Sequence, residues 1–550
     1  TKIRENIDNH RDISSLIDPV VQEYIYHKGM YLREPEFKPI LRAKAIAFEN
    51  AAGRDREVLD ELGNTVLYGH PDAQAILTKI QVENDRLLIL RNTVEGERPA
   101  GFVSYREIGN EDLFGVLKDM ELANLVRGKS SREILLITGI YAREDGTGDS
   151  GVIRDAPQQL LVEVLAKELE KNYSFALFVA ERGTVTKEVV YVLERQGFIR
   201  PHMADENDKR TIYMVDMHEP LMFLHNLDTT IKEPFASNPA VLDAVEKNHK
   251  KLQIAMTKLY PGNLVLSLSS GIMYHRLVDR ITALNDVPRE PLVPRRLGKN
   301  MCVPFGKILR GKVVPNTVTK TLHTDKVYEP DLNSFTIEPF PYYSPLKSQI
   351  ETIKSFDRPV ILVDDLVHTA NRLQVLVPQL REDGIPIKKV VVGVLSGYGR
   401  DLMQCLKVPV ESIYSMPNLR QWFVESTLYP FIGGDTVRRE EMKVAGLQPS
   451  INMILPYATP RLSGCSREAL VEFSACCIEN SRDLFQVLEA EYRKMYAKNL
   501  TLSRLSEAVI LPLCPDKGSC MEYDENLAAS VYLENDLETL WRMKEFMIKG

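Results

Sequence analysis

The stretch Val360-Ile-Leu-Val-Asp-Asp-Leu-Val-His-Thr-Ala-Asn-Arg372 is the clearest single feature of the chain. Its apolar run predicts a buried strand, after which come Asp364, Asp365, a short polar loop and a helix. In open parallel sheets ligands bind beyond the carboxyl ends of the strands, and a helix N-terminus there offers free N–H groups to a phosphate. The stretch therefore predicts a phosphate- and ribose-binding strand–loop–helix, whose two carboxylates accept sugar hydroxyls or hold Mg²⁺.

Strands and helices alternate on both sides of this stretch. The apolar segment 264–268 and the segments 389–395 and 410–415 are predicted as further strands with helices between them, which implies a largely parallel sheet. An earlier block also alternates. Its predicted strands are 87–92, 100–107, 133–142, 174–181 and 211–217, and its predicted helices are 157–171 and 185–196.

A chain of 550 residues is too long for one hydrophobic core. We expect an α/β protein with a mixed-sheet domain, a mainly parallel sheet domain and a mostly helical C-terminal extension. The expected segments are the tail of an upstream domain (1–34), the mixed-sheet domain (35–220), a linker (221–245), the parallel-sheet domain (246–459) and the helical extension (460–550).

The stretch at 360–372 resembles the phosphoribosyl pyrophosphate motif of type I phosphoribosyltransferases, through its apolar run, Asp364, Asp365 and Thr369. The resemblance implies that the acid pair orients the ribose through its 2′ and 3′ hydroxyls and helps to hold Mg²⁺. It also implies a 5′-phosphate loop made of His368, Thr369, Ala370, Asn371 and Arg372.

Three loop residues depart from the motif of that family. His368 and Arg372 each stand where threonine is usual, and Ala370 stands where glycine is usual. Glycine adopts positive φ readily and alanine does not, which bears on the loop conformation. Arg372 can add a charge-assisted contact to a phosphate.

Two further segments fit the same resemblance. Ser269, Ser270 and Gly271 follow an apolar strand and resemble the pyrophosphate loop of the family, without its usual basic residue. The segment 287–327 is long and basic and resembles the mobile catalytic loop that closes over pyrophosphate. Its basic residues are Arg295, Arg296, Lys299, Lys307, Arg310, Lys312, Lys320 and Lys326.

In the first block, the strand Leu135–Ala142 runs into Arg143-Glu-Asp-Gly-Thr-Gly148. The order of strand, Arg-x-x-Gly-x-Gly loop, helix, strand and helix resembles GNAT-type N-acetyltransferases. The resemblance implies acetyl-CoA as cofactor. The residues implied to bind its pyrophosphate are Arg143, Gly146, Thr147 and Gly148. Two departures are the insertion at 149–156 and Leu193, where a tyrosine acid is usual.

The first residues, Thr1-Lys-Ile-Arg4, resemble the end of nicotinate or nicotinamide mononucleotide adenylyltransferases. The resemblance implies that Thr1 and Arg4 contact the phosphates of ATP. It also leads us to expect a nucleotidyltransferase domain ahead of Thr1.

The composition limits the kinds of partner that the chain is expected to bind. The net charge of −7 argues against a nucleic-acid partner, and no apolar run approaches the length that spans a bilayer. Seven scattered cysteines indicate reduced thiols and a cytoplasmic location, and they form no pattern of a structural zinc site.

The leading hypothesis is a multi-domain transferase of nucleotide or cofactor metabolism, with small nucleotide-type substrates. An altered protein that only senses nucleotides or CoA, or a scaffold whose helical C-terminal region forms homo-oligomers, stays open as an alternative. The acceptor substrate is not identified by the sequence, and its determinants are expected at 415–458.

Overall fold

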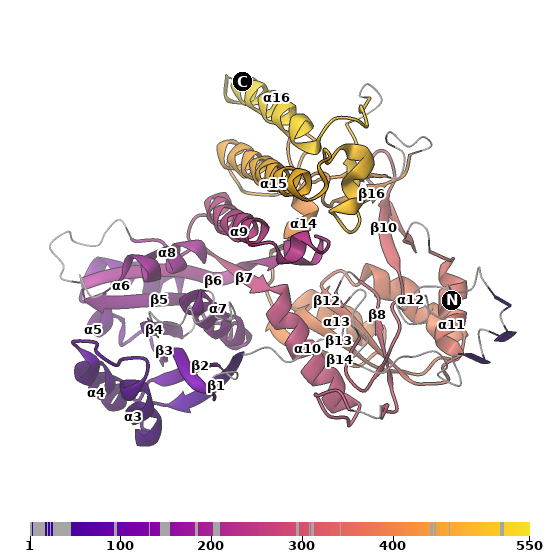
Figure 1. Cartoon of the computed structure of the whole chain (residues 1–550). Helices are drawn as coiled ribbons and strands as arrows, with labels where there is room; N and C mark the ends of the chain where they lie inside the picture. Colours follow the sequence, from indigo (N-terminus) through magenta and orange to yellow (C-terminus); the bar gives the residue numbers. More distant parts are fainter. Residues whose placement is uncertain are drawn as a thin grey trace.

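A computed structural model describes most of the chain, and Figure 1 labels its elements. The described residues are 3, 17, 18, 20, 21, 24, 25 and 46–549, except for 93–95, 131–132, 144–154, 182–184, 202–209, 293–295, 307, 310–312, 341–342, 440–443, 445–446, 461 and 518–521. Thr1, Arg4, Gly146, Thr147 and Gly148, on which sequence predictions rest, lie outside the described residues.

The first part of the chain is built on an eight-stranded mixed sheet, drawn at the left of Figure 1. The strand order is β1-β2-β3-β4-β5-β6-β15, with β7 also paired to β6. The strands are β1 (Ile46–Ala52), β2 (Arg86–Asn92), β3 (Arg98–Ile108), β4 (Ile134–Ala142), β5 (Phe175–Glu181), β6 (Arg210–His225), β7 (Asn263–Ser269) and β15 (Gln421–Val424).

Helices cover both faces of this sheet. On one face α7 and α8 share a core with the alternate residues Leu135 and Ile137 of β4. On the other face Ile134 and Leu136 pack with α5 and α6, and α3 and α4 pack on β2. These helices are α3 (Arg56–Asn64), α4 (Ala73–Glu83), α5 (Leu113–Leu117), α6 (Met120–Lys129), α7 (Ala156–Glu168) and α8 (Lys187–Arg195).

The predicted linker at 221–245 is wrong in its first five residues, which belong to strand β6. The strand continues to His225, and its residues Leu221–Leu224 pair with both β15 and β7 and are buried. Two short 3₁₀ turns, Leu227–Thr229 and Phe235–Ser237, then lead into helix α9 (Pro239–Leu259). The segment is part of a sheet because its apolar residues have a strand on each side.

The second sheet is wholly parallel, which confirms the mainly parallel sheet predicted from the alternation. Its order is β14-β13-β12-β8-β9, so β12 lies at its centre. The strands are β8 (Met301–Pro304), β9 (Val318–Thr319), β12 (Val360–Val367), β13 (Ile387–Ser396) and β14 (Val410–Met416). The helices nearby are α10 (Ser270–Leu284), α11 (Leu346–Lys354), α12 (Asn371–Glu382) and α13 (Gly397–Cys405).

Two predictions about this half were wrong. The strand at 264–268 belongs to the first sheet as β7, not to the sheet of β12. The segment 287–327 is not one mobile loop, because β8 and β9 within it are buried strands of the parallel sheet. A four-residue strand such as β8 is held by its neighbours and gives little signal in the sequence.

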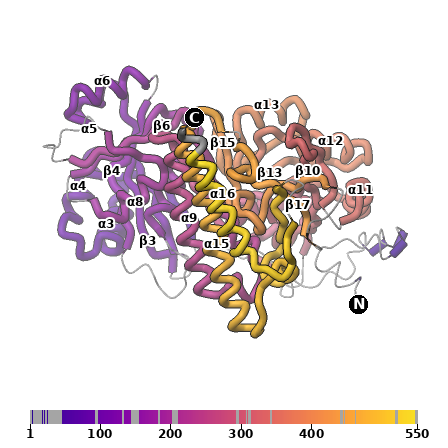
Figure 2. The backbone as a smooth tube through the Cα atoms, turned by 90° about the horizontal axis from the view of Figure 1, so that it is seen from above, coloured from indigo at the N-terminus to yellow at the C-terminus, as the bar shows by residue number. Residues whose placement is uncertain are grey.

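A smaller sheet and three long helices complete the fold. The sheet has the order β11-β10-β16-β17-β18, with β10 (Thr324–Tyr328), β11 (Phe335–Pro339), β16 (Asp435–Val437), β17 (Gln448–Ile451) and β18 (Leu513–Pro515). Helix α15 (Arg467–Tyr496) packs between α9 and α16 (Ala529–Lys549), and Figures 1 and 2 show the three side by side. Within the described residues, no helix is long and apolar enough to cross a membrane.

A buried carboxylate joins the two sheets. Glu163 of α7 is 2% exposed. Its Oε1 accepts from Arg276 of α10 at 2.5 Å, and its Oε2 accepts from Tyr414 of β14 at 2.9 Å. Helix α7 therefore packs on the first sheet with one side and is tied to the second sheet by this side chain.

Candidate functional site

The carboxyl ends of the five parallel strands gather at one edge of the second sheet, which is where ligands bind in such sheets. Asp364 and Asp365 lie at this edge, but inside β12 and not after it as predicted, since the strand runs to Val367. Asp364 is 3% exposed and its Oδ1 accepts from the Asp365 N–H at 2.9 Å. The acid pair is thus a rigid part of the strand.

The chain approaches Asp364 closely at Gly306, which follows β8. A Cβ atom on Gly306 would lie 1.8 Å from Oδ1 of Asp364. Only a glycine leaves room for the carboxylate at this point, so Gly306 belongs to the site although the sequence analysis did not single it out. No short-range pattern links it to β12.

Burial raises the pKa of Asp364 well above its ordinary value, and the neighbouring Asp365 raises it further. Arg372, whose Nη1 lies 3.8 Å from Oδ2 of Asp364, acts in the opposite direction and is the weaker influence. Asp364 therefore holds a proton more readily than an exposed aspartate. A bound cation, or a sugar hydroxyl that donates to it, would favour the ionised form.

Asp364→Asn is expected to raise the stability of the unliganded protein at neutral pH. The folded pKa is above the unfolded one, so wild-type stability is lost as pH rises from the unfolded pKa through the folded pKa. Asparagine carries no charge and avoids this loss. Thermal unfolding should show the variant melting higher at about pH 8, with the difference vanishing near about pH 4. Asp401→Asn, at an exposed position, is the control. An equal melting temperature at about pH 8 would contradict the expectation.

The loop after β12 leads into helix α12 through one residue in the left-handed conformation. Ala370 adopts φ 50°, so alanine takes the left-handed conformation for which glycine was expected. Helix α12 starts at Asn371, whose side chain donates to Thr369 Oγ1 at 2.8 Å, and no side chain caps its N-terminus. Arg372 lies in its first turn, and its buried Nε has no hydrogen-bond partner among the described residues.

His368 meets three residues that the sequence analysis did not link to it. Its Nδ1 lies 2.8 Å from Ser396 Oγ at the end of β13, and burial lowers its pKa. Its ring lies 5.0 Å from that of Trp422 in β15 and 5.7 Å from that of Tyr398 in α13. Tyr398 is 56% exposed, so the loop is flanked by an aromatic surface open to solvent.

The predicted pyrophosphate segment lies elsewhere than expected. Ser269 ends β7 of the first sheet, and Ser270 and Gly271 are the first residues of α10 and not a loop. Helix α10 nevertheless packs on β13, where Met273 lies against Gly393. The segment is therefore a helix start between the two sheets, because β7 continues directly into α10.

The predicted basic loop is divided by the fold. Lys320 follows β9 and is 6% exposed, and Lys326 lies in β10 with its ammonium 4.4 Å from the ring of Tyr328. Arg296 and Lys299 precede β8. Arg295, Lys307, Arg310 and Lys312 lie outside the described residues. Lys320 and Lys326 are held in place and cannot belong to a mobile loop.

In the first sheet, strands β4 and β5 are paired over a short length only. Their parallel register joins Leu135–Ile137 to Ala176–Phe178, and no later residues of the two strands pair. On its other edge β4 pairs with β3 along its length, except that Thr138 has no partner in the register. Beyond Ile137 the two strands therefore separate, and β4 offers backbone groups on that side.

The loop that follows β4 begins at Arg143, whose N–H donates to the Ala100 carbonyl at 3.0 Å. Gly146, Thr147 and Gly148 lie outside the described residues, so their predicted contact with pyrophosphate stays a prediction. Helix α7 begins at Ala156, which agrees with the insertion noted in the sequence.

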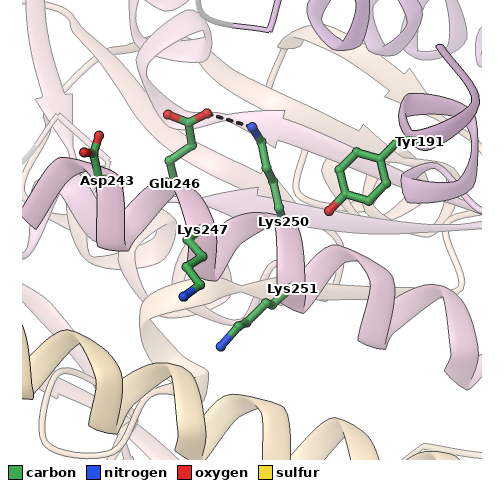
Figure 3. A pocket seen from close by; sticks show the side chains of 6 residues that line it. All are labelled: Tyr191, Asp243, Glu246, Lys247, Lys250 and Lys251. Atoms are coloured by element: carbon green, nitrogen blue, oxygen red, sulfur yellow. Dashed lines mark hydrogen bonds and ion pairs between the residues drawn. The ribbon is translucent and has the colours of Figure 1, made fainter. Parts of the chain in front are cut away.

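A surface pocket of about 410 Å³ lies between α8 and α9, shown in Figure 3. Lys250 pairs there with Glu246 at 2.8 Å. None of the residues predicted from the sequence lines it. The lining residues are Tyr191, Asp243, Glu246, Lys247, Lys250 and Lys251.

No family model matches the chain, and no curated protein matches it. Solved structures with a GNAT acetyltransferase-like fold match about a third of it. A putative GNAT acetyltransferase from Desulfovibrio desulfuricans is 11% identical, with 32% of this chain and 99% of that chain covered and a TM-score of 0.23. The catalytic domain of the Tetrahymena GCN5 histone acetyltransferase, in complex with coenzyme A, is 10% identical, with 32% and 93% covered and a TM-score of 0.21.

FeeM, an N-acyl amino acid synthase from uncultured soil microbes, is 17% identical, with 31% of this chain and 95% of that chain covered and a TM-score of 0.22. At these identities and TM-scores, the likenesses assign no activity to this chain.

Proposed function

We propose that the chain is a transferase that binds an acyl-CoA thioester, acetyl-CoA in the first instance, between β4 and β5. The observation that carries this is the separation of the two strands beyond Ile137 and Phe178. The backbone groups of β4 on that side suit the amides of the pantetheine arm, which can add to the strand as an extended peptide does.

The reaction proposed is acyl transfer to a small-molecule amine. The amine nitrogen attacks the thioester carbonyl, the C–S bond breaks, and the CoA sulfur leaves and takes up a proton while the amine loses one. The loop from Arg143 to Gly148 would bind the pyrophosphate of CoA in this proposal.

Filling the opening with a large side chain is expected to weaken CoA binding by about 100-fold, or about 2.7 kcal/mol. Ala180 of β5 lies just past the last pair with β4 and is partly buried on the face of α7. In Ala180→Trp the indole would occupy the space of the pantetheine arm. Calorimetric titration of the full chain with acetyl-CoA measures the change.

The matched control is Ala47→Trp, which places the same side chain on an exposed position of β1. It should bind acetyl-CoA like the wild type. If the wild type binds no acetyl-CoA at millimolar concentration, the proposed cofactor is wrong. If Ala180→Trp binds as the wild type does, CoA does not pass between β4 and β5.

We propose a second site, for a ribose phosphate such as phosphoribosyl pyrophosphate with Mg²⁺, at the carboxyl end of β12. The support is the Arg372 Nε, which is buried without a hydrogen-bond partner among the described residues, beside the uncapped start of α12. The phosphate would accept hydrogen bonds from Arg372 and from the backbone N–H groups of the loop. Asp364 and Asp365 would accept hydrogen bonds from the ribose hydroxyls or coordinate Mg²⁺.

Arg372→Met is expected to weaken binding of phosphoribosyl pyrophosphate by about 10- to 100-fold, since it removes a charge-assisted hydrogen bond. Methionine keeps the length of the side chain and loses its charge. Arg381→Met, in the last turn of the same helix, is the control and should leave binding unchanged. Calorimetry in the presence of Mg²⁺ measures both. Equal loss in the two variants would show that only the net charge matters.

Turnover separates the transferase from a sensor. Release of pyrophosphate or of free CoA by a chain that binds both ligands supports catalysis. Binding of both ligands without release, over a panel of bases and amines, would favour the alternative that the folds serve as metabolite sensors.

A further inference from the structure

Three residues that are far apart in the sequence meet above the first sheet. His225 is the last residue of β6, Glu425 is the first residue of helix α14 (Glu425–Leu428), and His249 lies on α9. Leu224 and Val424 are paired in the parallel register of β6 and β15, so the residues that follow them lie side by side. Helix α9 crosses over this point and supplies the second histidine.

The side-chain atoms of the three residues converge. His249 Nδ1 lies 2.6 Å from Glu425 Oε1, and His225 Nδ1 lies 3.8 Å from Glu425 Oε2. Their ligating atoms all lie within 4.8 Å of one another. The side chain of Glu425 is fully buried, and those of His225 and His249 are 12% and 20% exposed.

Two atoms of this cluster lack a protein partner. His225 Nδ1 and Glu425 Oε2 are buried, and neither has a hydrogen bond to any described residue. Their separation of 3.8 Å is too long for a hydrogen bond. Two atoms that both contact a tetrahedral ion at about 2.0–2.1 Å lie about 3.3–3.4 Å apart, so a small closing of this gap brings both within reach of one ion. The pair therefore offers two buried polar atoms, free of hydrogen bonds to the described residues, to a ligand between them.

The surroundings hold the cluster in place. Asn226 and Ser426, the next residues along each segment, are joined by two hydrogen bonds of 2.9 and 3.0 Å. Gln253 lies 2.9 Å from His225 Nε2 with its amide nitrogen. An ion on His225 Nδ1 would leave the proton of that ring on Nε2. If the Gln253 amide turns over, its oxygen can accept a hydrogen bond from this Nε2–H. The 3.4 Å hydrogen bond from Arg195 to the Gln253 oxygen is then lost.

We propose that His225, His249 and Glu425 bind one divalent first-row transition-metal ion. Two imidazoles and one carboxylate are the donor set of many zinc sites and of non-haem iron(II) sites. The ion would take the place of the proton between His249 and Glu425. Three protein ligands leave room for water or a ligand as a further donor. The site would also join β6, α9 and α14, which come from distant parts of the chain.

The test uses the full chain, freed of metal with a chelator and titrated with Co²⁺, whose visible absorption reports its ligands. We expect saturable binding of about one equivalent with nitrogen and oxygen ligands. Competition with Zn²⁺ and, without oxygen, with Fe²⁺ then shows which ion is preferred. A sulfur-to-cobalt band would place the ion on cysteines and overturn the proposal.

Glu425→Gln and His249→Ala should each bind Co²⁺ at least about 100-fold more weakly than the wild type. The matched control is His218→Ala, which removes a histidine that pairs with a carboxylate, Asp216, at 2.8 Å on the surface. It should bind Co²⁺ unchanged. Circular dichroism establishes that each variant is folded.

Two results would overturn the proposal. A wild-type chain that takes up no Co²⁺ or Zn²⁺ would show that the cluster is a buried ion pair between His249 and Glu425. Folded variants with wild-type affinity would place any bound ion elsewhere. If both variants fail to fold, the ligand signature in the spectrum of the wild type decides, since the cluster offers only nitrogen and oxygen.

Discussion

Glu163→Ala is expected to lower the free energy of unfolding by about 3–5 kcal/mol, the range for breaking a buried ion pair by removing one partner. Glu163 accepts hydrogen bonds from Arg276 and Tyr414 and is 2% exposed. Without it, Arg276 loses the carboxylate that accepts its hydrogen bond and stays largely buried, since its side chain is 23% exposed. The loss should be large because the residue joins α7 to both α10 and β14.

Urea unfolding measures this effect, with Glu170→Ala as the control. Glu170 lies just beyond α7 and is exposed, so its removal should change stability by less than about 1 kcal/mol. The double variant Glu163→Leu with Arg276→Met should be more stable than the sum of the single changes predicts, because the buried guanidinium is removed together with its carboxylate. Lys167, which also pairs with Glu163 at 3.1 Å, is partly exposed and stays hydrated in the variant. Additive losses would show that the two side chains do not act as a pair.

Gly197→Ala is expected to cost about 3–4 kcal/mol, for two reasons that add. Gly197 has φ 90°, which an L-residue adopts with strain. A Cβ atom there would also lie 2.1 Å from the backbone oxygen of Asn263, at the start of β7. Backbone cannot turn aside as a flexible side chain does, so α8 and β7 would have to move apart.

Gly384→Ala separates the two causes. Gly384 also has a positive φ, 73°, but a Cβ atom there would meet nothing within 4 Å. It should cost only the conformational strain, about 1–2 kcal/mol. The difference between the two variants in urea unfolding then measures the contact of Gly197 with β7. Equal losses of unfolding free energy in the two variants would mean that β7 moves away from the added Cβ atom without destabilising the fold.

The parallel sheet could be predicted because its central strands are buried on both faces. β12 and β13 contain the continuous apolar runs 360–363 and 390–392, and such runs are typical of parallel strands covered by helices. Helix α15 lies in the predicted helical extension, and its apolar residues recur at helical spacing over 30 residues.

The second half of β6 could not be predicted in the same way. Pro220 lies within the strand and gives a local signal for a break, and the register with β7 shifts between Asp216 and Leu221. The strand resumes because β7 and β15 pair with Leu221–Leu224. Those partners come from other parts of the chain, so no window of sequence around β6 contains the cause.

The candidate site was predicted in part for a similar reason. The acid pair and the loop form one continuous motif, which sequence spacing reveals. The neighbours Gly306, Ser396 and Trp422 arrive from three other segments, and their contacts exist only after the fold is formed. At Ala370 tertiary packing overrides local preference, since the residue is buried against the core of the sheet in a conformation that alanine disfavours.

The pairing of β6 with β15 has a consequence for biosynthesis. The two contact points Asn226 and Ser426 are 200 positions apart in the chain. While the protein is made on the ribosome, the first sheet emerges with one stretch of β6 uncovered until β15 has been translated. An apolar strand edge left open for that time can pair with other nascent chains. The first sheet to emerge therefore waits for β15, a strand that follows most of the second sheet in the chain, before its β6 edge is covered.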